Sequence, residues 1–304
     1  GGMGITAHRP KEEDFVERMF VCSSHDDILL FSNLGRVYRI KAYEIPEAAR
    51  TARGRAIVNI VQIASYEKIN TLIPVKDSSH GFIAFATKDG LIKKTRIGEF
   101  SRINRNGKIA IKLNEGDSLI SVEFTAGKSQ LMIASGKCIR FDERDVRAMG
   151  RDTAGVKAMK LGKDDCLVDM LVVDKDKDVL TVTSKGYGKR SDLEDYRFQN
   201  RAGKGIKAGV FTDVTGYLVN MKQVTENDDI MIISDGGTII RMHCSDISRI
   251  GRNTKGVRLM RLKDGEVATV AVTERDEEEE AESALAQSGE AQVSETEAKA
   301  TTEE

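Results

Sequence analysis

The feature that most constrains the fold of this chain is a repeat of about fifty residues. Five segments share one layout, in which a short apolar run leads through a glycine turn into a second strand-like run. The turn glycines are Gly35, Gly90, Gly136, Gly186 and Gly237. A base follows each glycine by four residues, an acid by nine and an apolar residue by ten. This shared register predicts five copies of one β-hairpin unit.

A second glycine opens another short strand in each unit, at Gly54, Gly107, Gly155, Gly205 and Gly256. Counting back one period from Gly54 reaches Gly4, which adds a sixth member to this series. One hairpin cannot bury its apolar face, whereas a radial array of four-stranded blades can. The series predicts an all-β, closed, six-bladed disc over residues 1–273, like a propeller. In it, the strand after Gly4 completes the sheet that the C-terminal repeat leaves unfinished.

The composition narrows the class of protein further. Trp is absent and aromatic residues make up only 5% of the chain, so we expect a core of Ile, Val, Leu, Met and Ala. No apolar run approaches the ~18 residues of a membrane span, and the N-terminus does not resemble a signal peptide. The four Cys and four His are scattered along the chain, which favours isolated side chains in a reducing cytoplasm over disulfides or a metal site.

The C-terminal segment 274–304 differs from the rest of the chain. It contains 12 acids and 2 bases, for a net charge of −10, whereas residues 1–273 carry a net charge of +9. Its lack of large apolar residues predicts a disordered tail. Two interpretations stay open: a tail that aids solubility, or a polyanion that competes with a nucleic acid for the basic body.

Bases recur in the loop before each second glycine. We call the whole recurring set the basic belt, because one loop repeated in every blade occupies one radial position. The loop bases are Arg50, Arg53, Arg102, Arg105, Arg147, Arg151, Arg197, Arg201, Lys204, Arg249, Arg252 and Lys255. The following strands add Arg55, Lys108, Lys157, Lys207 and Arg258, and the bases four residues after the turn glycines are Arg39, Lys94, Arg140, Arg190 and Arg241.

A basic belt around a disc suits duplex DNA that bends along the rim, because neutralised phosphates release counterions without any base contact. Aromatic residues are sparse near these loops, which argues against a platform for single strands. The alternative for each Arg is an ion pair with an acid of a neighbouring blade, such as Glu99 or Asp145.

Several motifs resemble the C-terminal domain of the larger polypeptide of bacterial DNA gyrase, its A chain. They include Gly35-Arg-Val-Tyr, Arg53-Gly-Arg-Ala-Ile-Val-Asn, Gly107-Lys-Ile-Ala-Ile-Lys-Leu, Gly186-Tyr-Gly-Lys-Arg and Gly251-Arg-Asn-Thr-Lys-Gly-Val. That family carries a box of Gln-Arg-Arg-Gly-Gly-any-Gly, and residues 1–4 match its last four positions. The Gln-Arg-Arg is missing, so we expect that the sequence was cut from a longer chain, and the resemblance leaves supercoiling by this exact chain in doubt.

The resemblance implies a six-bladed β-pinwheel, a propeller whose blades exchange a strand with their neighbours. It also implies that the domain wraps duplex DNA with positive handedness, so that a cytoplasmic A2B2 gyrase can introduce negative supercoils using ATP. Gly1, Gly2 and Gly4 of the box would join the basic belt in binding DNA. The partners would be the cleavage domain of the same polypeptide and the second type of gyrase polypeptide, and ATP and Mg²⁺ would be bound in the parent complex.

This chain itself is predicted to be non-catalytic, without a cofactor or a metal. It lacks the P-loop pattern G-x-x-x-x-G-K-[ST], and its six Tyr lie in strand or turn patterns rather than in a cleavage site. A close rival is the C-terminal domain of topoisomerase IV, which supports decatenation. A protein-interaction propeller is disfavoured by the absence of Trp, and a glycosidase propeller would need convergent carboxylates at its axis.

Overall fold

In the computed structural model, the described residues are 5–6, 26–44, 63–75 and 80–275. They form twenty β-strands and five short 3-10 helices, and this part of the chain contains no α-helix. The all-β prediction is therefore confirmed. Some predicted features lie outside the described residues: Gly1, Gly2, Gly4, Arg50, Arg53, Arg55 and the segment 276–304.

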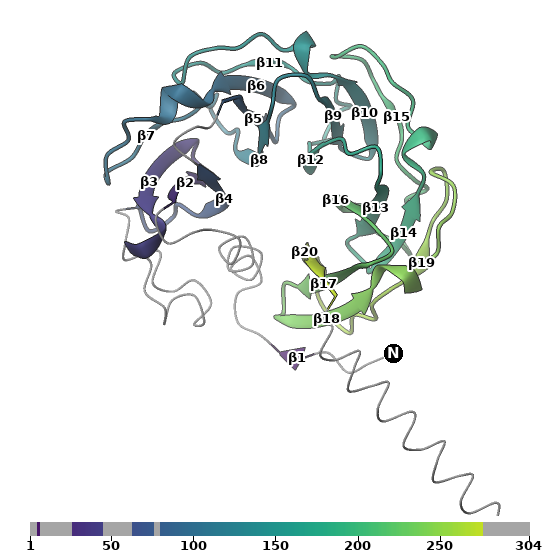
Figure 1. Cartoon of the computed structure of the whole chain (residues 1–304). Coiled ribbons are helices and arrows are strands. Elements are labelled where there is room, and N and C mark those ends of the chain that lie inside the picture. Colours follow the sequence, from purple (N-terminus) through teal and green to yellow (C-terminus); the bar gives the residue numbers. More distant parts are fainter. Residues whose placement is uncertain (1–4, 7–25, 45–62, 76–79, 276–304) are drawn as a thin grey trace, which may run out of the picture.

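The strands form five four-stranded antiparallel sheets, which we call blades 1 to 5 (Figure 1). From the centre outward, blade 1 contains β4 (Ile69–Val75), β2 (Asp27–Ser32), β3 (Arg36–Lys41) and β7 (Lys108–Ile109). Blade 2 contains β8 (Leu119–Thr125), β5 (Phe82–Thr87), β6 (Leu91–Arg96) and β11 (Val156–Lys157). Blade 3 contains β12 (Asp169–Val172), β9 (Gln130–Ala134), β10 (Lys137–Asp142) and β15 (Ile206–Lys207).

Blade 4 contains β16 (Leu218–Val224), β13 (Asp178–Thr183), β14 (Tyr187–Ser191) and β19 (Val257–Arg258). Blade 5 contains β20 (Val267–Glu274), β17 (Asp228–Ser234), β18 (Thr238–His243) and β1 (Ile5–Thr6). A 3-10 helix follows the third strand of each blade: η1 (Ala42–Glu44), η2 (Ile97–Phe100), η3 (Glu143–Asp145), η4 (Leu193–Asp195) and η5 (Cys244–Asp246).

The prediction of six blades is wrong, because the chain has five. The middle of each blade is a hairpin around a turn glycine, and the sequence contains five such hairpins. Counting second glycines gave six because those glycines open only the outer strand. The inner strands pack in the order β4, β8, β12, β16, β20, and no comparable packing joins β20 to β4 within the described residues. The five blades therefore form an arc in Figure 1.

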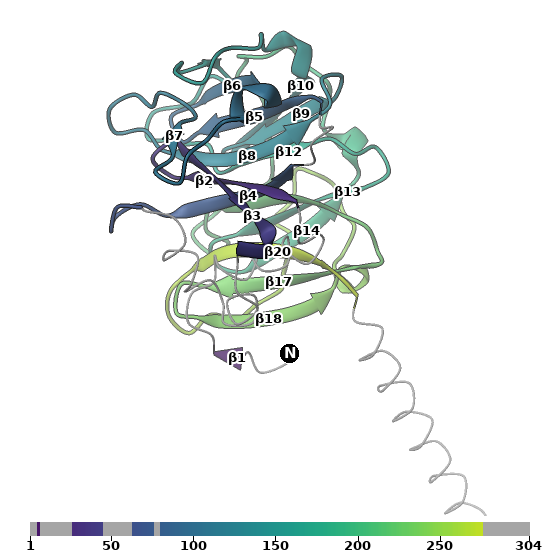
Figure 2. The ribbon, with the colours of Figure 1, turned by 60° about the vertical axis from the view of Figure 1, so that its left-hand side comes forward.

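The outer strand of each of blades 1 to 4 comes from the following repeat. For example, β7 pairs with β3 and β11 pairs with β6. The outer strand of blade 5 comes from the N-terminus, because Ile5 pairs with Ile239 and Thr6 with Thr238. Figure 2 shows β20, β17, β18 and β1 in this order across one sheet. The expected strand exchange and the expected role of the N-terminal strand are therefore confirmed.

The second glycines allow this exchange. Gly155 and Gly205 have φ angles of +93° and +74°, which are left-handed conformations that other residues rarely adopt. A Cβ atom would lie 2.4 Å from the carbonyl oxygen of Ile92 at Gly155, and 2.5 Å from that of Cys138 at Gly205. Glycine is thus required where the exchanged chain crosses the backbone of the preceding blade.

The hydrophobic core lies between neighbouring blades rather than within one of them. Leu29 and Phe31 of blade 1 pack with Ile83 and Phe85 of blade 2, and equivalent clusters join blades 2–3, 3–4 and 4–5. The expectation of a core without aromatic residues fails at the first interface. There the ring centroids of Phe31 and Phe85 lie 5.5 Å apart, and the edge-to-face contact fixes how the two blades meet.

Candidate nucleic-acid interface

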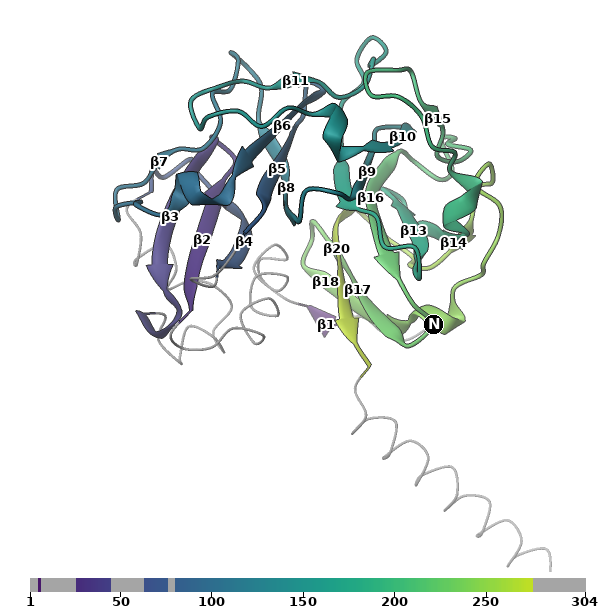
Figure 3. The same cartoon turned by 45° about the horizontal axis from the view of Figure 1, so that its top comes forward.

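The basic loops lie on the outer edge of the blades. We define the rim loops as residues 101–107, 147–155, 197–205 and 248–256, which run from each 3-10 helix to the next second glycine. Each of the last three forms a parallel bridge with the preceding blade, at Lys94–Ala148, Arg140–Phe198 and Arg190–Arg249. Figure 3 shows the segments that carry β11 and β15 along the outside of blades 2 and 3. The topology therefore brings the rim loops to one edge, as the repeat predicted.

The bases four residues after the turn glycines do not belong to this exposed edge. Lys94, Arg140 and Arg190 are only 4–5% exposed. Their side chains donate to carbonyl groups near a 3-10 helix, as in Arg140 Nη1 to Tyr196 O (3.1 Å) and Arg190 Nε to Ile247 O (3.0 Å). Arg39 likewise reaches Phe100 O (2.8 Å). Their assignment to DNA binding is corrected, because these side chains turn inward and find their partners within the protein.

Carboxylates compensate the charge of these inward bases. Arg39 pairs with Asp27, Arg190 Nη1 lies 3.2 Å from an oxygen of Asp178, and Lys94 Nζ lies 3.6 Å from Glu143, which is fully buried. Arg241 of blade 5 also pairs with an acid, Asp229, but its side chain is 36% exposed.

The sequence analysis missed these pairs. The available signal was the acid near the start of the first strand of three hairpins, twelve residues before the base: Asp27 before Arg39, Asp178 before Arg190, and Asp229 before Arg241.

A second group of bases braces the rim loops. Arg151, Arg201 and Arg252 occupy equivalent positions, and each is only half-buried. One Nη1 atom donates to the outer strand one blade earlier: Arg151 to Ile109 O (3.1 Å), Arg201 to Lys157 O (2.5 Å) and Arg252 to Lys207 O. Because each side chain is also accessible to solvent, these residues combine a structural role with the capacity to contact an anion.

The other belt bases are solvent-accessible, as a phosphate contact requires. Arg105 pairs with Glu44 (3.2 Å), Arg249 pairs with Asp178 and Asp192, and Arg258 lies over the ring of Tyr187. Such exposed ion pairs contribute only ~0–1 kcal/mol and exchange readily for a phosphate. The remaining exposed or half-buried belt bases make no side-chain hydrogen bond or ion pair within the described residues: Arg102, Lys108, Arg147, Lys157, Lys204, Lys207 and Lys255. Arg197 is also exposed, and its guanidinium faces the Gln199 amide.

One hollow of about 450 Å³ opens on the rim where repeats 2 and 3 meet. Its lining includes Arg96, Arg102, Lys108 and Arg151, together with the acid Glu99. Four cations against one carboxylate leave the hollow electropositive, and forked guanidinium donors match the oxygens of a phosphate. The hollow therefore offers a concentrated anion-binding geometry on the described rim.

Two buried lysines lie beneath the rim loops. Lys93 is fully buried, and its Nζ donates to Ala110 O (2.6 Å) and Arg151 O (2.5 Å). Lys189 is 2% exposed and donates to Arg252 O and Thr254 O, the latter at 2.8 Å. Burial lowers the pKa of Lys93 to about 7 and that of Lys189 to about 8. The sequence analysis did not single out either residue, because each lies one position before a repeat base.

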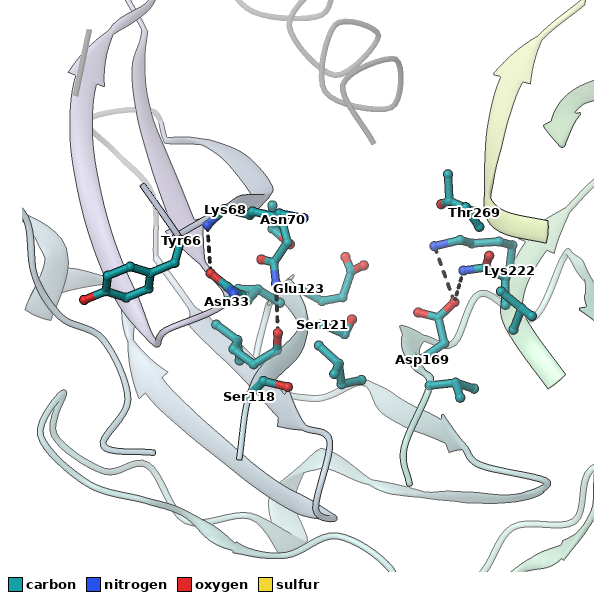
Figure 4. Close-up of a pocket in the computed structure, with 18 residues that line it drawn as sticks. Asn33, Tyr66, Lys68, Asn70, Ser118, Ser121, Glu123, Asp169, Lys222 and Thr269 are labelled. Atoms are coloured by element: carbon teal, nitrogen blue, oxygen red, sulfur yellow. Dashed lines mark hydrogen bonds and ion pairs between the residues drawn. The ribbon is translucent and has the colours of Figure 1, made fainter. Parts of the chain in front are cut away.

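The centre of the arc holds a polar cavity of about 540 Å³ (Figure 4). Its two carboxylates, Glu123 and Asp169, are the feature that a glycosidase propeller would need. However, Asp169 accepts from the backbone of Met221 (3.0 Å) and pairs with Lys222 (3.4 Å). Because Asp169 is committed to joining β12 to β16, the cavity does not offer a free acid–base pair.

The described residues carry no sign of a metal site or of a membrane-spanning helix. They contain no group of three or more His, Cys, Asp and Glu residues arranged to hold a metal ion. Among them there is also no helix that is long and apolar enough to cross a membrane.

Comparisons with known proteins agree with this architecture. The family model described as "DNA gyrase C-terminal domain, beta-propeller" matches residues 26–76, 81–126, 134–174, 177–224 and 228–274, which follow the five repeats. The A chain of DNA gyrase from Staphylococcus epidermidis is 44% identical over 285 residues, covering 91% of this chain and 32% of the relative. Its counterpart from Staphylococcus aureus is 44% identical over 289 residues, covering 93% and 33%.

Solved structures resemble the fold as well. A C-terminal domain of DNA topoisomerase IV aligns with a TM-score of 0.77 at 26% identity, covering 87% of this chain and 84% of that one. A DNA gyrase A C-terminal domain aligns with a TM-score of 0.75 at 25% identity, covering 90% and 91%. This chain spans about a third of the length of its curated relatives, and it belongs to the family of DNA gyrase C-terminal β-propeller domains.

Proposed function

We propose that this chain binds duplex DNA along its outer rim and bends it around the arc. The observation that carries the proposal is the recurrence of accessible Arg and Lys in the four described rim loops and the strands that follow them. Blades that repeat the same loop place these charges at successive points of one curved edge. A duplex offers phosphates at regular intervals along its axis, so a curved row of cations engages more of them if the duplex bends.

The two kinds of base have different tasks in this mechanism. The inward bases, such as Arg140 and Arg190, hold neighbouring repeats together and fix the curvature of the rim. The accessible bases, such as Arg102 and Arg147, neutralise phosphates and release counterions. A pre-formed curvature reduces the conformational cost of ordering the protein when DNA binds.

The larger setting is also a proposal, because this chain is only part of its relatives' length. We infer that it serves as the wrapping domain of a cytoplasmic gyrase with A2B2 composition. In that assembly the remainder of the A chain would cleave DNA, and the B chain would bind ATP with Mg²⁺. Wrapping with positive handedness would present a second duplex segment to the cleavage gate. Strand passage would then introduce negative supercoils.

A salt titration tests the binding step. The affinity of this chain for a duplex of mixed sequence, measured by fluorescence anisotropy, should fall by orders of magnitude between ~50 and ~200 mM salt. Little dependence on sequence is expected, because phosphates carry no base information. An affinity that stays flat across this range would refute the proposal.

A topology assay tests the wrap. Relaxed plasmid is incubated with this chain and a nicking-closing enzyme, and the linking number is read after the protein is removed. A shift of the topoisomer distribution toward positive values is expected. An unshifted distribution despite saturated binding would leave binding without wrapping, which would favour the topoisomerase IV-like alternative suggested by the similar solved structure.

A further inference from the structure

We propose that Lys93 and Lys189 are positioning residues for DNA binding, which hold two rim loops from beneath so that Arg151 and Arg252 face the phosphates. This inference rests on the proposed function, but it concerns residues that DNA cannot touch. Both lysines follow a turn glycine by three residues, on β6 and β14, and both Nζ atoms bind a carbonyl group of a rim loop.

The contacts show how each lysine holds its loop. Lys93 Nζ binds the carbonyl oxygen of Arg151 at 2.5 Å, while the side chain of Arg151 donates to Ile109 O at 3.1 Å. Lys189 Nζ binds the carbonyl oxygen of Arg252, whose side chain donates to Asp195 O (3.0 Å) and Lys207 O. Each arginine is thus fixed through both its backbone and its side chain. Fixing a long side chain before binding lowers the entropy cost of a phosphate contact.

Blade 3 is the internal comparison. Its equivalent position is Ile139, which lies beside Gly203 of the rim loop instead of binding a carbonyl. A blade of this fold therefore forms without the lysine. An amine buried without charge compensation costs more than an apolar residue of similar size, so burial alone does not account for its presence in blades 2 and 4. What the lysine adds is a directional contact to the loop that carries the arginine.

The strongest consequence lies at the rim hollow. Arg151 lines it together with Arg96, Arg102 and Lys108, and Lys93 binds the backbone of Arg151. The charged groups that act on Lys93 are Asp152, Arg151 and Glu99. Loss of Lys93 frees the loop, so the hollow loses one of its four convergent cations even though every exposed charge is still present.

The test is a double-mutant cycle with Lys93→Ile and Arg151→Ala, each measured for duplex affinity at several salt concentrations. Lys93→Ile should weaken binding about tenfold at low salt, the effect of losing one charge-assisted contact. It should also reduce the slope of log affinity against log salt by about 1, since one fewer phosphate is neutralised. Adding Lys93→Ile to Arg151→Ala should cost nothing more, because the lysine acts through the arginine.

Ile139→Val in blade 3 is the matched control at the equivalent buried position, and it should leave both affinity and slope unchanged. Additive losses in the cycle, or an unchanged salt slope in Lys93→Ile, would overturn the inference while the proposed function stands. Amide hydrogen exchange of residues 147–155 without DNA gives an independent reading. It should be faster in Lys93→Ile, and unchanged exchange would reject the positioning role even if the wild-type chain did not bind DNA.

Discussion

Two sets of bases in this chain look alike in the sequence and differ in the fold. Bases such as Lys94, Arg140 and Arg190 lie on the third strand of a blade and are buried. Bases such as Arg102, Arg147 and Lys204 lie in the loops outside that strand and face solvent. A base on a strand buried on both faces must find partners inside the protein, whereas a base in a rim loop is free for an external anion. Position relative to the sheet therefore decides the task of each charge.

The sharpest way to test this comparison is to remove one inward base. Lys94→Ala leaves the fully buried carboxylate of Glu143 without its cation, and it removes the contact to Glu143 O (3.2 Å). Breaking a buried pair in this way costs about 3–5 kcal/mol of unfolding free energy. Urea denaturation should show this loss. The matched control is Arg147→Ala, which should change stability by no more than about 0.5 kcal/mol. Equal losses for the two variants would contradict the division.

The outward set should show the reverse behaviour. Replacing Arg147 and Lys204 together by Ala should leave the urea midpoint nearly unchanged and weaken duplex binding across all sequences. The slope of log affinity against log salt should become shallower by about 1.8, from ~0.9 per lost phosphate contact. Anisotropy titrations at several salt concentrations measure this slope. A slope as steep as that of the wild type would mean that neither base meets a phosphate.

Between the two sets stand the buried lysines, which predict a pH effect on stability. Burial lowers the pKa of Lys93 from 10.5 to about 7. Between these two values the unfolded chain holds a proton that the native chain has released, so rising pH favours the native state over this range. At pH values below both, each state is protonated and the dependence vanishes. Comparing wild type with Lys93→Met by thermal unfolding from about pH 6 to about pH 10 should show this rising contribution only in the wild type.

The smallest expected effect comes from the acidic segment. Residues 276–304 carry 11 acids and 1 base, and as a tethered polyanion they would compete with phosphates for the outward bases. The deletion must start after Arg275, because β20 ends at Glu274 and Arg275 binds Ser245 and Glu226 O. Deletion should tighten DNA binding severalfold at low salt and have little effect near 1 M, where the Debye length is ~3 Å. Equal affinities at low salt would leave only the solubility interpretation.

Most of the architecture could be predicted from the sequence because glycine spacing reports backbone geometry directly. Gly155 and Gly205 are spaced by the period of the blades because each marks the crossing of an exchanged strand. The number of blades was misjudged because Gly4 belongs to the same series without a sixth hairpin beside it. At the interface, the described loop bases lie on one edge as predicted. The inward turn of Arg140 and Arg190 could not be seen, since it depends on a carbonyl supplied by the next repeat.

The exchange of outer strands also sets how a gene for this domain can change in length. The repeated stretch of DNA and the folded blade are out of phase, because a blade takes its last strand from the repeat that follows. If one whole period is lost, the repeat that moves up supplies the missing edge of the blade before it. No sheet is then left with an open side, so recombination between repeats can shorten or lengthen the arc in steps of one blade.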